Sequence, residues 1–158
     1  MKTFMELYDF HTMQFRNVLE GISDEDAMNR LNTKANHVAW LAGSLVQERF
    51  ELGKAMGITD IRQTSDELFS DHKGIQDGVT YPSLDEYRKD WEVITPRLRE
   101  AFASVSNEKL DGPDPFEMPG GPYTLYDAIT FCTDRESYCI GQIGLWRRLL
   151  GYEPMKYG

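Results

Sequence analysis

Four long segments of the chain repeat apolar residues at intervals of three and four, the spacing that puts side chains on one face of an α-helix. They span roughly residues 2–22, 33–56, 83–105 and 124–150, and no segment alternates convincingly enough to be a strand. Four amphipathic helices joined by two long connections predict an all-α four-helix bundle.

Polar residues mark where two of these helices begin. Ser83 with Glu86, and Thr124 with Asp127, have the spacing of a capping box, in which each side chain bonds the other residue's backbone N–H. Pro96 lies inside the third segment and lacks a backbone N–H. We therefore expect it to kink or interrupt that helix.

The two connections, Ile58–Pro82 and Asn107–Tyr123, are unusually long for a compact bundle. The first has a candidate short helix at Ser65–Phe69, whereas the second, with "DGPDPFEMPGGPY", is too rich in proline and glycine for regular structure. Long connections in small domains often cover a functional site, and we expect that of these.

The length and charge of the chain narrow the classes of partner. A chain of 158 residues predicts a single domain over residues 1–158. The formal net charge is −9 and no run of basic residues is longer than a pair such as Arg147–Arg148, so we expect neither nucleic acid nor a membrane as partner. Glu6 and Asp9 interrupt the apolar run that a signal peptide needs, which favours a cytoplasmic protein.

Two cysteines, Cys132 and Cys139, fall in the fourth predicted helix. Seven helical residues rise about 10 Å, which is beyond the Cα separation of about 7 Å that a disulfide tolerates. We therefore expect two reduced thiols, as is usual in the cytoplasm.

Polar residues also occur where the helical spacing predicts apolar ones. Glu48 falls in the stripe of the second helix, and the stripe of the fourth passes through Arg135 or Glu136 and then Cys139. A charged side chain on a buried face must be paired.

Two stretches carry a resemblance to a known family. "NHVAWLAGSLVQERF" (Asn36–Phe50) and "DRESYCIGQIGLWRRLLGY" (Asp134–Tyr152) resemble the two signature regions of the DinB-like superfamily. The resemblance implies a four-helix bundle with up-down-down-up topology, often a homodimer, with a divalent metal held by three histidines between the helices. Some members of that superfamily are thiol-dependent isomerases or transferases.

The sequence departs from the family pattern at the three metal-ligand positions, which carry Ser44, Arg135 and Cys139. Zinc prefers Cys, His or carboxylate ligands, and a guanidinium repels a divalent ion. We therefore predict no bound metal and no cofactor. Of the remaining histidines, His11 lies in a helix stripe, and we expect it to be a hydrogen-bonded core residue.

Two interpretations of the altered positions stay open. In the first, Glu48 and Arg135 form a buried ion pair that Ser44 completes, so that the guanidinium replaces the metal charge. In the second, Arg135 lowers the pKa of the Cys139 thiol and makes it a nucleophile, or holds an anionic substrate. No general base is evident beside Cys139, which weighs against the nucleophile.

The sequence thus favours a metal-free DinB-like protein with a residual inter-helix pocket for a small molecule, formed by Ser44, Glu48, Arg135 and Cys139. The alternatives are a thiol-dependent transferase or isomerase-like enzyme, and a non-catalytic homodimeric bundle. No residue is assigned a catalytic role, and whether the protein is an enzyme stays open.

Overall fold

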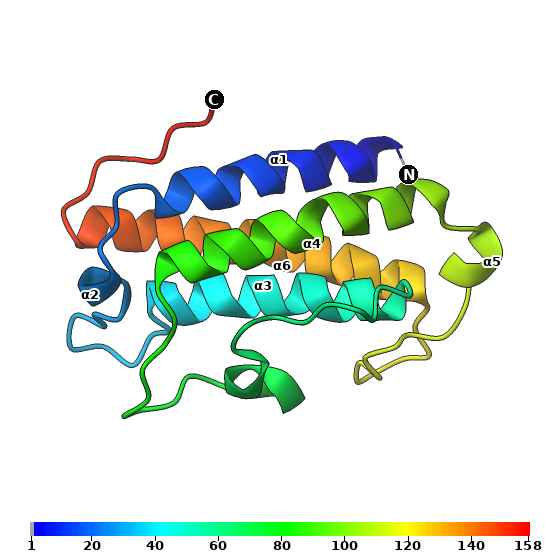
Figure 1. Cartoon of the computed structure of the whole chain (residues 1–158), viewed down its shortest axis with the longest axis horizontal. Helices are drawn as coiled ribbons and strands as arrows, with labels where there is room; N and C mark the ends of the chain where they lie inside the picture. The colour runs from blue at the N-terminus through cyan, green and yellow to red at the C-terminus, as the bar shows by residue number, and fades with distance from the viewer. Residues whose placement is uncertain (1) are drawn as a thin grey trace.

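The computed structural model describes residues 2–158, and its long helices lie side by side as a helical bundle (Figure 1). They are α1 (Lys2–Leu19), α3 (Val38–Ala55), α4 (Leu84–Ser104) and α6 (Leu125–Leu149). Helix α3 packs against α4 and α6, and α1 packs against the same two helices. The described residues form no β-strand, which confirms the all-α prediction.

Short helical elements occupy the connections. Helix α2 (Asp24–Ala27) follows α1, two 3₁₀ turns (Asp66–Leu68 and Ser70–His72) lie between α3 and α4, and α5 (Asn107–Leu110) follows α4. We expected the connection at residues 107–123 to be irregular, but it begins with a helical turn. The Ser106 side chain accepts a hydrogen bond from the backbone N–H of Lys109 and caps a single helical turn.

Helix α3 begins five residues later than the sequence spacing predicts. His37 is its N-cap, with Nδ1 accepting from the backbone N–H of Trp40 at 3.0 Å. The preceding residues are held outside the helix, because the Arg30 guanidinium donates hydrogen bonds to the carbonyls of Lys34 and Ala35. A local contact between a side chain and the backbone therefore sets this boundary.

The starts of the other two long helices are as predicted. Ser83 and Thr124 each form a complete capping box with the acidic residue three positions on. Helix α4 runs without interruption past Pro96, so the predicted break does not occur.

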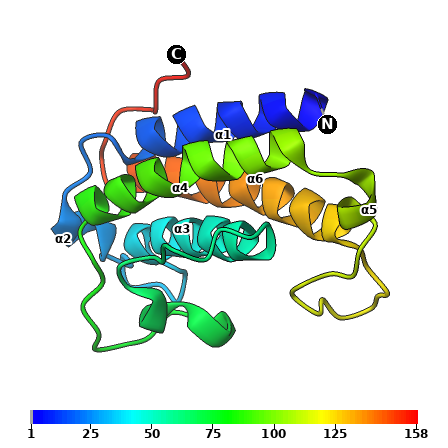
Figure 2. The same ribbon diagram turned by 45° about the vertical axis from the view of Figure 1, so that its right-hand side comes forward.

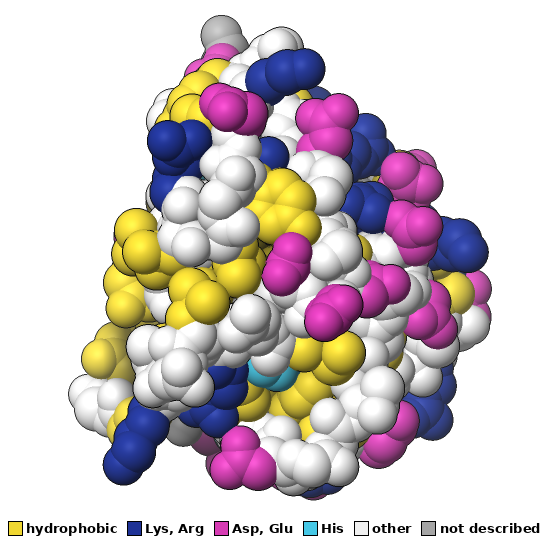
Figure 3. Space-filling view, turned by 90° about the vertical axis from the view of Figure 1, so that its left-hand side faces the viewer, with side chains coloured by type: hydrophobic (Ala, Val, Ile, Leu, Met, Phe, Trp, Pro, Cys, Tyr) yellow, Lys and Arg dark blue, Asp and Glu magenta, His cyan; other side chains and the backbone are white. Residues whose placement is uncertain are grey.

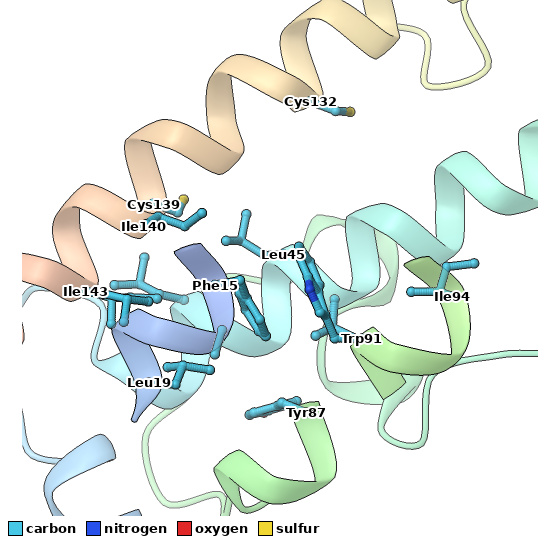
Figure 4. Packing of buried hydrophobic residues seen from close by; sticks show 14 of the residues in the cluster. Phe15, Leu19, Leu45, Tyr87, Trp91, Ile94, Cys132, Cys139, Ile140 and Ile143 are labelled. Carbon is cyan, nitrogen blue, oxygen red and sulfur yellow. The ribbon is translucent and has the colours of Figure 1, made fainter. Parts of the chain in front are cut away.

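The core lies where the four long helices meet (Figure 4). Its centre is a stacked aromatic pair from α1 and α4, Phe15 and Trp91, with ring centroids 4.0 Å apart. Both side chains are fully buried, as is Leu45 from α3. The apolar stripes read from the sequence thus form one continuous core.

Among residues 2–158, no helix is both long and apolar enough to cross a bilayer. At the end of the bundle seen in Figure 3, basic and acidic side chains are interspersed with apolar ones.

Candidate functional site

A cavity of about 530 Å³ lies between α3, α6 and the two long connections. Both connections lie on the α3 side of the bundle (Figure 2), and each supplies part of the wall, as expected of cover segments. The lining residues are Trp40, Ser44, Gln47, Glu48 and Glu51 from α3; Phe69, His72, Lys73, Phe116, Glu117, Met118 and Pro119 from the connections; and Phe131, Cys132 and Arg135 from α6.

Arg135 projects from α6 toward two residues of α3. It donates from Nη1 to Glu48 Oε2 at 3.0 Å and from Nη2 to Ser44 Oγ at 3.1 Å. The predicted ion pair and its serine partner are therefore confirmed. The pair is less buried than expected, because 25% of the Arg135 side chain and 12% of the Glu48 side chain remain exposed at the cavity.

The Glu48 carboxyl is only half satisfied. Its Oε2 accepts from Arg135, but its buried Oε1 has no hydrogen-bond partner among the described residues. Burial raises the pKa of Glu48 to about 8, and the nearby Arg135 guanidinium offsets only part of that rise. Near neutral pH this carboxyl can therefore exchange a proton with little cost.

The two thiols do not behave as the nucleophile hypothesis requires. Both thiols are only 3% exposed and belong to the buried core (Figure 4). Cys139, predicted to line the pocket, is not part of the cavity wall, whereas Cys132, two turns away on α6, is. Both are free thiols, as predicted. Burial raises the pKa of Cys139 despite the opposing charge of Arg135, so at neutral pH the thiol keeps its proton.

Two residues of the cavity wall have a strained backbone. His72 and Glu117, from different connections, have φ values of 56° and 51°, in the left-handed region that non-glycine residues rarely adopt. Such conformations cost about 1–3 kcal/mol each and cluster at functional sites. Their presence on both sides of one cavity marks this region as the candidate site.

A second, deeper charged cluster lies outside this cavity. Arg49 from α3 is fully buried and holds Glu136 of α6 through two hydrogen bonds, of 2.5 Å from Nε and 3.0 Å from Nη2. His11 from α1 is a further hydrogen-bond partner of this carboxylate, with its Nδ1 3.2 Å from Glu136 Oε2. The prediction that His11 is a hydrogen-bonded core residue is therefore confirmed. The sequence spacing left open whether Arg135 or Glu136 belongs to the inward-facing stripe of α6, and both side chains point toward α3.

Arg49 is held on every side. Its Nη1 donates to the hydroxyls of Thr12 and Thr95, and its guanidinium carbon lies 3.5 Å from the Trp91 ring centroid and 4.0 Å from that of Tyr8. Burial alone would raise the pKa of Glu136, but Arg49 and His11 hold it below its ordinary value. Because Glu136 and the Arg49 guanidinium are each held by several buried partners, this cluster stabilises the fold.

The residues Ser44, Arg135 and Cys139 do not fit a divalent metal. Ser44 accepts a hydrogen bond from Arg135, whose permanently charged guanidinium repels a metal cation. In the described part of the chain, no three His, Cys, Asp or Glu side chains lie close enough together to hold a metal ion. Three or four such ligands are the usual requirement for zinc.

Comparison with known protein families and with curated protein sequences finds no match for this chain.

Proposed function

We propose that this protein is a DinB-like four-helix bundle with up-down-down-up topology. The two motif stretches support this, because they fall on α3 and α6, which pack against each other. The chain directions in Figure 1 also support it, since α1 and α6 run opposite to α3 and α4. The parallel neighbours α3 and α4 need a long crossover in this topology, and the connection between Ala55 and Leu84 supplies it.

The function we propose is the binding of a small molecule with an anionic group, without a metal. The observation that carries it is the environment of Arg135, whose guanidinium borders a cavity of about 530 Å³ and is only partly used by Ser44 and Glu48. Cavities of about 300–1,000 Å³ with a few polar groups are typical small-molecule sites. A guanidinium binds carboxylates well because its N–H groups form a fixed fork.

A thermal-shift screen of small carboxylates tests this function. A compound that binds the native state stabilises it by RT ln(1 + [L]/Kd) and so raises the melting temperature. We expect aromatic carboxylates to raise it in the wild-type protein and not in Arg135→Gln, whose own melting temperature gives the baseline. A panel that shifts both proteins equally, or neither, contradicts the proposal.

A homodimer is a second proposal, which exposed apolar residues on two packed helices support. Leu7 and Phe10 on α1, and Tyr138 and Leu145 on α6, are exposed large hydrophobic residues on two helices that pack together. Extended apolar faces on soluble proteins usually meet a partner. Sedimentation of the wild-type protein should give a dimer mass, and Tyr138→Glu with Leu145→Glu a monomer; a monomeric wild type contradicts it.

A further inference from the structure

Arg135 has binding capacity left over. A guanidinium carries five N–H groups, and within the described residues Arg135 uses one toward Glu48 and one toward Ser44. Trp40, one turn before Ser44 on α3, lines the same cavity and has an Nε1–H with no partner in the described part of the chain. The cavity therefore offers several unused donors to one anionic group.

The same cavity also offers unused acceptors. Glu48 and Glu51 lie three residues apart on α3, so their carboxyl groups share one face of the helix. The buried Oε1 of Glu48 has no partner among residues 2–158. Two like charges at this spacing destabilise each other unless a cation lies between them, and Arg135 contacts only Glu48.

The charge of the lining argues against a purely anionic ligand. Its acidic side chains are Glu48, Glu51 and Glu117, and its basic ones are Lys73 and Arg135. The pKa of Glu48 is about 8, so at pH 7 this carboxyl is mostly protonated and the charges of Glu51 and Glu117 face those of Lys73 and Arg135. A ligand that brings only negative charge leaves the acidic side chains unmatched. A ligand that also brings a positive group satisfies both halves.

Aromatic side chains form a further part of the cavity wall. They belong to Trp40, Phe69, Phe116 and Phe131. Their ring faces attract cations as well as apolar groups. An apolar body between the two charged ends of a ligand would lie against these rings.

We propose that the cavity binds a zwitterionic small molecule, whose carboxylate is held by Arg135 and whose ammonium group is held by Glu48 and Glu51, with an apolar body between them. This rests on the proposed function, because it assumes that Arg135 binds an anionic group. It goes further in assigning α3 a cation-binding half of the site. Glu51 is then a specificity residue, since only ligands with an amine would use it.

Three matched probes separate the two halves of the site. They are 4-(aminomethyl)benzoic acid, which is a zwitterion, 4-methylbenzoate, which keeps only the anion, and benzylamine, which keeps only the cation. Calorimetric titration at pH 7 and low salt should show the zwitterion binding at least about tenfold more tightly than either single-charge probe, since each end of it gains a charge-assisted contact.

Substitutions then assign each end of the ligand. Glu51→Gln should weaken the zwitterion about fivefold or more and leave 4-methylbenzoate unchanged, because only the amine contacts the carboxyl pair. Arg135→Gln should abolish binding of both. Glu100→Gln, an exposed carboxyl on α4 outside the cavity, is the matched control and should change nothing. Circular dichroism verifies the fold of each variant.

Two results would overturn the proposal and are distinguishable. If 4-methylbenzoate binds as tightly as the zwitterion, and Glu51→Gln affects neither, the zwitterion proposal fails while the anion site at Arg135 stands. If none of the three probes binds at millimolar concentration, the anion site fails with it.

Discussion

Replacing Arg49 with Met is the perturbation to which the fold should be most sensitive. Arg49 is fully buried, and the change removes its two hydrogen bonds to Glu136 and one each to Thr12 and Thr95. It also removes a guanidinium that lies over the Trp91 ring. Methionine fills much of the volume of the arginine side chain, so the loss of stability comes mainly from the missing charge and hydrogen bonds.

The magnitude follows from the carboxylate left behind. Without Arg49, the buried Glu136 keeps only His11 as a partner, at 3.2 Å. Breaking a buried ion pair by removing one member costs about 3–5 kcal/mol, whereas an exposed pair contributes about 0–1 kcal/mol. Arg62, paired with Asp66 and 75% exposed, supplies the matched control as Arg62→Met.

Urea denaturation at pH 7 measures the free energy of unfolding of the wild-type protein and of each variant. We expect Arg49→Met to lower the value by about 3–5 kcal/mol with little change in the slope against denaturant, and Arg62→Met to lower it by less than about 1 kcal/mol. Adding Glu136→Leu to Arg49→Met should recover a substantial part of the loss, since no charge is then orphaned. A loss below about 1 kcal/mol for Arg49→Met, within the range of exposed pairs, would refute the account of this cluster.

The pH dependence gives an independent reading of the same cluster. Arg49 and His11 hold the pKa of Glu136 below its ordinary value, so their stabilisation is present above the unfolded pKa and is lost as pH falls through the folded one. In Arg49→Met the carboxyl can take up a proton instead. The difference between wild type and variant should therefore shrink on acidification, and a constant difference from pH 7 to pH 4 would contradict this.

Three further predictions concern the cavity and its surroundings. The folded pKa of Glu48, about 8, exceeds its ordinary value, so the contribution of Glu48 to stability is present in acid and is lost as pH rises toward 8. Relative to Glu48→Gln, the wild-type free energy of unfolding should therefore fall by up to about 1.4 kcal/mol per pH unit. Urea titrations across this pH range measure the difference, and parallel profiles for the two proteins would exclude it. Because burial raises the pKa values of Cys132 and Cys139, iodoacetamide should modify the native protein more slowly than a free thiol at pH 7.5. Mass spectrometry measures the rate at each cysteine. Labelling of Cys139 faster than the free thiol would support the nucleophile hypothesis. A Cβ at Gly43 would overlap Phe69, so Gly43→Ala should cost about 1–3 kcal/mol, and a melting temperature equal to wild type would show that the cavity wall yields freely.

The helices were predictable because apolar spacing records which face is buried. The boundaries that were predicted wrongly depend on local hydrogen bonds between a side chain and the backbone. Helix α3 begins at Val38 because the Arg30 side chain holds the preceding carbonyls, and α5 forms because Ser106 caps one turn within a proline- and glycine-rich stretch. Neither effect appears in a periodic pattern.

The pairing of Arg135 with Glu48 and Ser44 was predictable from the family register, but the pair of Arg49 with Glu136 was missed. Helix α3 is covered by both α4 and α6, and most of its residues are buried. Adjacent residues that point in different directions, such as Glu48 and Arg49, are therefore both enclosed. A single-stripe interpretation of α3 could not find this, although a long helix with few exposed positions was a signal.

We propose that the Arg135 guanidinium, paired with Glu48, occupies the place where a metal would lie in DinB-like proteins. An anomalous difference map at the zinc edge, from crystals of the untagged protein grown with zinc, tests this proposal. We expect no anomalous peak in the cavity and an intact contact between Arg135 and Glu48. A zinc peak coordinated by Glu48 and Cys132, with Arg135 turned away, would contradict it.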